Sequence, residues 1–239
     1  MTRDRMESMS EVRATTFPGA ADRVTGFLRG VYMWMFVGLG LTALVALYIA
    51  SSPAIVMAIA GNRLLFFGLM AAQLGIVFGL SATVNRIAPA TASFLFLAYA
   101  ALTGVTLSFV LLAFTGESVA TTFLITAGMF GAMALYGTTT SRSLVGAGQF
   151  FFMGLIGMII ASVVGIYWHS SALQFLISFV GVIVFTGLTA YDAQRLKAMA
   201  LAIPDGRVGS YTVVGALSLY LNFINLFLSL LRLFGNRRD

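Results

Sequence analysis

A chain of 239 residues that is 59% hydrophobic and 9% charged lacks the charge needed for the hydrated surface of a soluble domain, in which about a quarter of residues are charged. Its net charge of +6 lies in tails and short loops, so we expect contact with the anionic headgroups of a lipid bilayer and no nucleic acid. With no cysteine and one histidine, the chain offers no disulfide, no thiolate nucleophile and no zinc site of the usual ligands, and we expect no cofactor.

The apolar runs exceed the ~20 residues that a helix needs to cross the hydrocarbon core, and they lack the alternation of an outer-membrane barrel strand. We place helical spans at 31–50, 64–84, 90–114, 119–138, 148–168, 171–192 and 210–233. Residues 1–29 then form a polar tail, 30–235 a single membrane domain and 236–239 a short C-terminal tail. The first run is too long and begins too late for a signal-peptide core. The predicted fold class is an all-α integral membrane bundle of seven helices.

The distribution of Lys and Arg predicts the orientation of the chain. With the N-terminus in the cytoplasm, ten of the 14 basic residues lie on the cytoplasmic side, and four lie on the other: Arg63, Arg232, Arg237 and Arg238. A re-entrant last segment would leave only Arg63 outside, but the stretch from Gly209 to Leu231 is long enough to cross. No cleavable signal or transit pattern is evident, so we expect a bacterial cytoplasmic (inner) membrane.

Glycines are frequent in the predicted spans. Small residues let membrane helices approach closely, so we interpret these glycines as positions of helix packing. They are Gly38 and Gly40; Gly68, Gly75 and Gly79; Gly128 and Gly131; and Gly154 and Gly157.

Asp192 is the only carboxylate that falls near a long apolar span, and Arg195 and Lys197 follow it closely. An ionisable group at membrane depth is expensive, which indicates a functional site facing protein or water. A helix cap in the headgroup layer is an equally weighted alternative. A single aspartate cannot form an aspartyl-protease dyad, and the serines have no buried histidine as a base, since His169 sits in a loop at the end of a span, so we expect no enzyme activity.

The last predicted helix carries a polar seam on one face. Its members recur at spacings of three and four: Gly215, Ser218, Asn222, Asn225, Ser229 and Arg232. Apolar residues such as Leu219 and Phe223 occupy other faces, and we expect their exposure to lipid to differ from that of the seam. The seam itself cannot face lipid. It either forms hydrogen bonds between helices or lines a buried ion or proton path, with Asp192 and Arg86 as its charged partners.

Two C-terminal segments, Thr-Gly-Leu-Thr-Ala-Tyr-Asp-Ala-Gln-Arg-Leu-Lys at 186–197 and Gly-Ala-Leu-Ser-Leu-Tyr-Leu-Asn-Phe-Ile-Asn at 215–225, resemble the Bax inhibitor-1 family (transmembrane Bax inhibitor motif proteins). The resemblance covers about 23–235. It implies a seven-helix bundle in which the other six helices wrap a central last helix. It also implies a pH-sensitive calcium leak, in which aspartates on the sixth and seventh helices share a proton and an arginine ending the second helix latches onto them.

By this resemblance, Asp192 matches the first aspartate and Arg86 matches the arginine latch, but Asn222 stands where the second aspartate is expected. Two adjacent carboxylates hold a proton between them, and an Asp–Asn pair has no such repulsion. The Asn222 amide can instead donate a hydrogen bond to ionised Asp192. Contact between them requires the last helix to begin deep in the cytoplasmic layer, because Asp192 ends its predicted span.

The resemblance implies a cation path along this seam, since calcium prefers oxygen ligands and Asp192, Asn222, Asn225 and Ser218 supply them. One carboxylate makes a weak site, so any calcium bound at Asp192 is expected to be transient. The alternative function is a non-conducting regulator that binds another membrane protein complex. The sequence predicts neither the identity of such a partner nor the oligomeric state.

Overall fold

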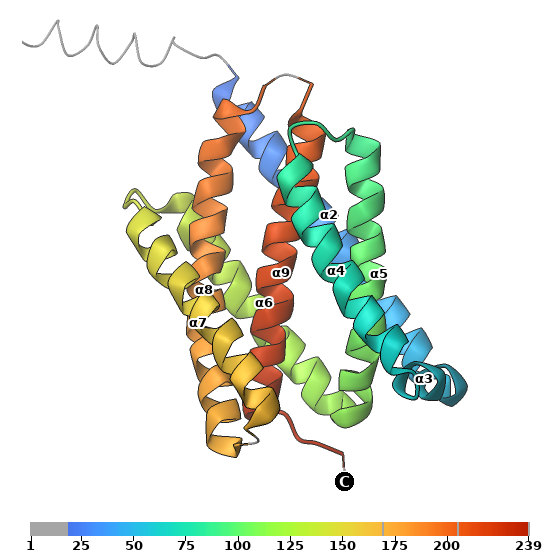
Figure 1. The fold of residues 1–239 in the computed structure, drawn as a ribbon. Coiled ribbons are helices and arrows are strands. Elements are labelled where there is room, and N and C mark those ends of the chain that lie inside the picture. The colour runs from blue at the N-terminus through green and yellow to red at the C-terminus, as the bar shows by residue number, and fades with distance from the viewer. Residues whose placement is uncertain (1–18, 169, 205, 239) are drawn as a thin grey trace, which may run out of the picture.

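The computed structural model describes residues 19–168, 170–204 and 206–238 (Figure 1). Within these residues the chain forms eight α-helices: α2 (Ala20–Ala50), α3 (Pro53–Ala60), α4 (Arg63–Thr83), α5 (Pro89–Ala113), α6 (Gly116–Thr139), α7 (Val145–Tyr167), α8 (Ser171–Ala202) and α9 (Val208–Phe234). All but the short α3 are long and apolar enough to cross a membrane. The predicted all-α integral membrane bundle is confirmed.

Two helices, α2 and α8, are longer than their predicted spans by ten residues or more. α2 begins at Ala20, so residues 20–29 of the predicted polar tail are helical, with Asp22 in the first turn near the positive end of the helix dipole. α8 continues past Asp192 to Ala202. Arg and Lys are good helix formers, so the helix does not end where the apolar run ends. Residues 1–18 and His169 lie outside the described residues, and their predicted placements remain predictions.

The short connections between the helices carry local start signals. Asn62, Thr115 and Ser170 each accept a hydrogen bond from the backbone N–H three residues later, which caps α4, α6 and α8 respectively. Gly206, with a φ of 88°, takes the left-handed conformation in the turn before α9. α3 was not predicted. It is a short helix with Pro53 at its first position, and it lies in the connection between the predicted spans 31–50 and 64–84.

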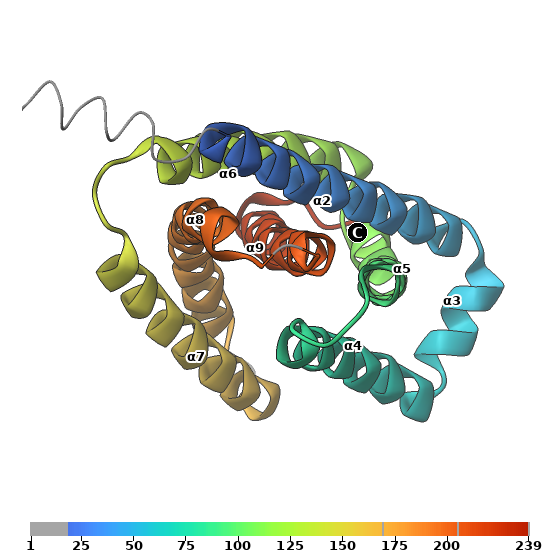
Figure 2. The same cartoon turned by 90° about the horizontal axis from the view of Figure 1, so that it is seen from above.

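Helix α9 lies at the centre of the bundle (Figure 2), packed against α2, α5, α6 and α8. In the most apolar 18-residue stretch of α9, 72% of the residues are buried, compared with 6–39% in the corresponding stretches of the other spans. The expectation of a central last helix is therefore confirmed. α7, however, packs mainly on α8.

The apolar faces of α9 are also covered by protein. Leu219 is fully buried, and the Phe223 ring lies edge-on to the Phe123 and Phe130 rings of α6. The expected contrast in lipid exposure between Leu219 or Phe223 and the polar seam is therefore wrong.

Close helix contacts occur at a different set of glycines from the one predicted. A Cβ on Gly38 would lie 2.5 Å from the Phe96 ring, and one on Gly154 would lie 2.9 Å from Val184, so these two positions are confirmed. The interpretation is wrong for the others, where a Cβ would meet open space: Gly40, Gly68, Gly75, Gly79, Gly128, Gly131 and Gly157. The tightest approach to the backbone of another helix is at Gly137 of α6, where a Cβ would lie 2.1 Å from the Ala190 carbonyl oxygen of α8.

A buried polar cluster joins α9 to α2 and α5. The Tyr220 hydroxyl lies 2.6 Å from the Thr42 hydroxyl, which donates to the Ala100 carbonyl at 2.8 Å. The rings of Phe96 and Tyr99 contact the Tyr220 ring edge-on. These contacts fix the rotation of α9 about its axis and so the direction in which its polar seam faces.

Candidate functional site

Asp192 lies within α8 and is 8% exposed. Since α8 continues to Ala202 and α9 returns antiparallel from Val208, the two helices bring Asp192 level with Ser218 and Asn222. The last helix does not have to begin unusually deep for this contact. The cap interpretation of Asp192 is wrong, because the carboxylate sits inside the helix and against α9.

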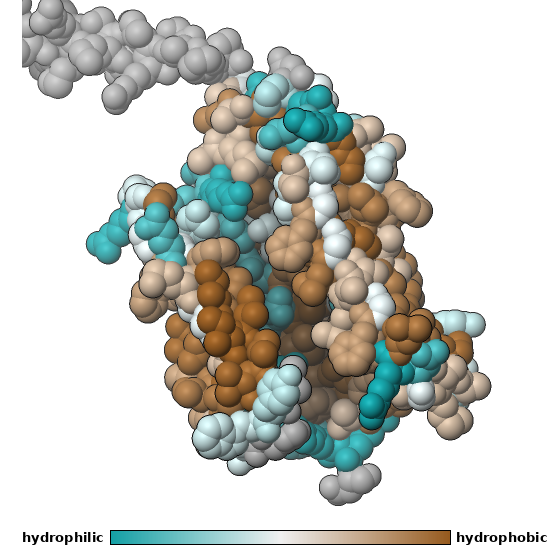
Figure 3. Space-filling model, in the orientation of Figure 1, coloured by the Kyte–Doolittle hydropathy of each residue, from teal (hydrophilic) through white to brown (hydrophobic). Residues whose placement is uncertain are grey.

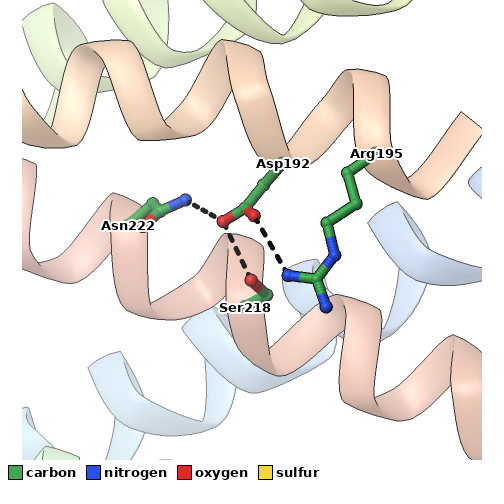
Figure 4. A network of polar contacts seen from close by, with 4 residues as sticks. All are labelled: Asp192, Arg195, Ser218 and Asn222. Carbon is green, nitrogen blue, oxygen red and sulfur yellow. Dashed lines mark hydrogen bonds and ion pairs between the residues drawn. The ribbon is translucent and has the colours of Figure 1, made fainter. Parts of the chain in front are cut away.

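Two neutral donors on α9 hold one oxygen of the Asp192 carboxylate (Figure 4). The Ser218 hydroxyl donates to Oδ2 at 2.9 Å, and the Asn222 amide donates to the same atom at 2.7 Å. On the other oxygen, Oδ1, the Arg195 guanidinium approaches to 3.9 Å from one helical turn along α8. The Arg195 side chain is 56% exposed, so this ion pair is loose and open to solvent.

The structure brings together only part of the predicted constellation. Asn225 lies near the group, but its amide donates to the Leu221 carbonyl of its own helix at 2.8 Å. Arg86 is exposed in the turn after α4, and within residues 19–168, 170–204 and 206–238 the ion pair of Asp192 is made by Arg195 and not by Arg86. The i,i+3 spacing of Asp192 and Arg195 on one helix is the sequence signal that identifies this pair.

Two cavities meet at Asp192. One, of about 210 Å³, lies between α4, α8 and α9 and reaches Ser81 and Tyr211; the other, of about 430 Å³, lies between α7, α8 and α9 and reaches Asn225. Both are lined by Asp192, Arg195, Ser218 and Leu221. The carboxylate is therefore buried against α9 and yet lies beside space that can hold water.

One face of α9 is incompletely covered where these cavities lie. Its partly exposed residues recur every three or four positions: Tyr211, Val214, Ser218, Leu221, Asn225 and Leu228. This face looks into the interval between α4 and α7, which stand apart in the view from above (Figure 2). The molecular surface is hollowed there, with hydrophilic residues on the floor of the hollow (Figure 3).

Beyond Asn225 the contact between α8 and α9 closes. A Cβ on Gly181 would lie 2.5 Å from the Ser229 hydroxyl, and both residues are buried. The Ser229 hydroxyl donates to the Asn225 carbonyl, and the Ser178 hydroxyl donates to the Gln174 carbonyl, each within its own helix. The polar cavities thus extend from the end of the bundle that holds the α8–α9 turn to about the level of Asn225, and a dry helix contact follows.

The chemistry of the site is that of a single carboxylate with neutral polar neighbours. Among the described residues, no three His, Cys, Asp or Glu side chains gather as metal ligands. A calcium ion at Asp192 would draw its remaining ligands from the oxygens of Ser218 and Asn222 and from water. Such a set suits brief contact with a passing cation better than tight binding.

Comparison of the sequence with known proteins identifies a matching family and several relatives. The family model described as "Inhibitor of apoptosis-promoting Bax1" matches residues 24–239. The inner membrane protein YbhL of Escherichia coli (strain K12) is 50% identical over 215 residues, which cover 89% of this chain and 92% of that protein. An uncharacterized protein of Deinococcus radiodurans is 42% identical over 235 residues, 98% of this chain and all of that protein. An uncharacterized membrane protein of Streptococcus pyogenes serotype M3 is 37% identical over 213 residues, 87% of this chain and 92% of that protein.

Proposed function

Because the chain belongs to the Bax inhibitor-1 family, we propose that it is a calcium-permeable leak of a bacterial inner membrane, with an ion path that follows α8 and α9 past Asp192. The observation that carries the proposal is a carboxylate, 8% exposed at membrane depth, that lines two cavities at once. An intramembrane ionisable group of this kind marks ion pathways more often than it serves packing.

The path has an entrance, a site and a closed segment. A cation enters the cavity near Ser81 and Tyr211, meets Asp192, and continues in the second cavity to Asn225. The contact of Gly181 with Ser229 then closes the path. In this proposal conduction requires α8 and α9 to separate at that contact, and the closed state has its vestibule on the side of the α8–α9 turn. The Lys and Arg distribution supports a cytoplasmic position for this side.

Arg195 acts in this proposal as a tethered cation that competes with calcium for Asp192. An exposed ion pair contributes about 0.2–1 kcal/mol, so Arg195 occupies the site without blocking it permanently. Arg86 is the latch that the family resemblance implies. Since it is exposed at the end of α4, it would reach Asp192 only after α4 moves toward α8.

The test is calcium flux into proteoliposomes that contain a calcium dye. Asp192→Asn, which keeps the shape of the side chain and removes its charge, should lower the flux and flatten its pH dependence. Arg195→Ala should raise the flux at neutral pH by up to about fivefold, the factor that corresponds to about 1 kcal/mol. Arg86→Ala should raise it only if the latch forms in another conformation. Arg63→Ala, an exposed cation at the far end of α4, is the matched control.

A flux through Asp192→Asn equal to that of the unaltered protein, with normal folding, would contradict the ion path. Flux at the level of protein-free vesicles in every variant and in the unaltered chain would favour the alternative, a non-conducting regulator that binds another membrane protein. The two outcomes are distinct, because the first retains a leak and the second has none.

A further inference from the structure

A second feature, remote from Asp192, is a long apolar groove between α2 and α6. Two cavities of about 740 and 690 Å³ follow one another there, and they share the lining residues Leu39, Ala43, Phe123 and Phe223. Phe223 belongs to α9, so the central helix forms the floor where α2 and α6 diverge. Because α2 and α6 are both membrane-spanning helices, the groove opens toward the hydrocarbon of the bilayer.

The wall of the larger cavity has few polar groups that could bind water. Of its polar lining residues, Thr42 donates its hydroxyl to Ala100, and Ser51 donates its hydroxyl to the Tyr48 carbonyl. The remaining lining is apolar, apart from one cation at its end, Arg238. An apolar void at membrane depth is filled by hydrocarbon, because unsatisfied water there is costly.

The chain after α9 holds Arg238 at the mouth of the groove. Its backbone N–H donates to the Ala113 carbonyl at 3.0 Å, and the Thr115 N–H donates to the Asn236 carbonyl at 3.0 Å. The Arg237 guanidinium lies 5.9 Å from the centre of the Phe114 ring. These contacts fix the C-terminal segment against the turn between α5 and α6, so the exposed Arg238 lies at the end of the larger cavity, where α2 ends and α6 begins.

We propose that this groove is a binding site for an anionic phospholipid, with an acyl chain between α2 and α6 and the headgroup phosphate at Arg238. The complementarity has two parts: an apolar groove made of two successive cavities, and a guanidinium, which binds phosphate through paired N–H donors. The lipid belongs to the leaflet on the side where α9 ends. By filling the space in front of Phe223, it would also brace α9 from the face opposite the Asp192 cavities. The proposal stands independently of ion conduction.

The test measures lipid at the groove with a tryptophan reporter. Phe123→Trp, in a background that carries Trp34→Phe and Trp168→Phe, is reconstituted in phosphatidylcholine vesicles with brominated phosphatidylglycerol or brominated phosphatidylcholine as quencher. One cation at the interface favours an anionic lipid by about fivefold, so brominated phosphatidylglycerol should quench at about fivefold lower mole fraction. Arg238→Ala should remove this preference, whereas Arg63→Ala should retain it.

Groove filling supplies a second arm. Ala120 is exposed and lines the groove, so Ala120→Phe should reduce quenching by both lipids; Ala132, exposed on α6 but outside the groove, is the matched control. Equal quenching by both lipids, or a preference that survives Arg238→Ala, would mean unselective lipid contact and overturn the proposal. Absence of quenching would mean that protein covers the groove, and would overturn it too. Native mass spectrometry of the unaltered chain should show retained phosphatidylglycerol whether or not the reporter folds.

Discussion

Replacing Asn222 with Asp should move the pH dependence of the leak upward. The Asn222 amide nitrogen lies 2.7 Å from Asp192 Oδ2, so the substitution places a second carboxyl group directly against the first. When both groups are ionised they repel each other, and binding one proton between them relieves the repulsion. The paired carboxyls therefore hold a proton to higher pH than Asp192 does beside an amide.

The magnitude follows from the separation of the two charges. Unit charges about 4 Å apart repel by about 4 kcal/mol at an effective dielectric constant near 20, which corresponds to about three pH units. Water in the two adjoining cavities screens part of this repulsion, so the expected displacement lies between about one and three pH units. The other titratable residues lining these cavities are Arg195, Tyr191 and Tyr211, and all three remain in the variant.

The assay is calcium flux against pH for both proteins in the same lipid. Asn225→Asp is the matched control, because it adds an equal charge to the same cavity while the Asn225 amide bonds to Leu221 and not to Asp192. Its midpoint should move less than that of Asn222→Asp. Identical midpoints for Asn222→Asp and the unaltered chain would show that position 222 takes no part in proton sensing, and that the reasoning from the Asp192 contact is wrong.

Two further predictions concern packing. Gly137→Ala should lower the free energy of unfolding by about 1–3 kcal/mol, since the new methyl group meets the Ala190 carbonyl. Gly128→Ala on the same helix should not lower it, because the methyl group meets open space there and Ala is the better helix former. Equal melting temperatures of the two variants in detergent would refute this. Tyr220→Phe should lower the free energy of unfolding by about 0.6–1.7 kcal/mol, because the hydrogen bond to Thr42 is lost while Thr42 keeps its bond to Ala100. A double-mutant cycle of Thr42→Val and Tyr220→Phe that shows no coupling energy would contradict this.

The sequence predicted the overall architecture well, because hydropathy is a sum over a local window. A span of apolar residues needs no knowledge of its neighbours to be identified as a membrane helix. The exceptions lie at the ends. The extensions of α2 to Ala20 and of α8 to Ala202 depend on helix-forming residues beyond the apolar runs, and so hydropathy alone ends both helices early.

For the candidate site, the sequence supplied the residues and the structure supplied their pairing. The spacing of Ser218 and Asn222 puts them on one face of a helix, and Asp192 is conspicuous by its position at membrane depth. That both donors meet the same carboxylate oxygen follows from the length of α8 and the turn before α9. Register between two helices depends on where each one ends, which a periodic pattern does not specify.

The apolar content by itself determined that this chain is a membrane bundle, and the spacing of polar residues determined that the last helix carries them on one face. Tertiary structure decided the partners: Arg195 instead of Arg86 beside Asp192, and Gly137 instead of Gly128 where α6 most closely approaches the backbone of α8. The physical reason is that hydropathy and spacing are properties of one helix. Contact depends on the rotation and translation of one helix against another, and these are fixed by packing at many distant residues at once.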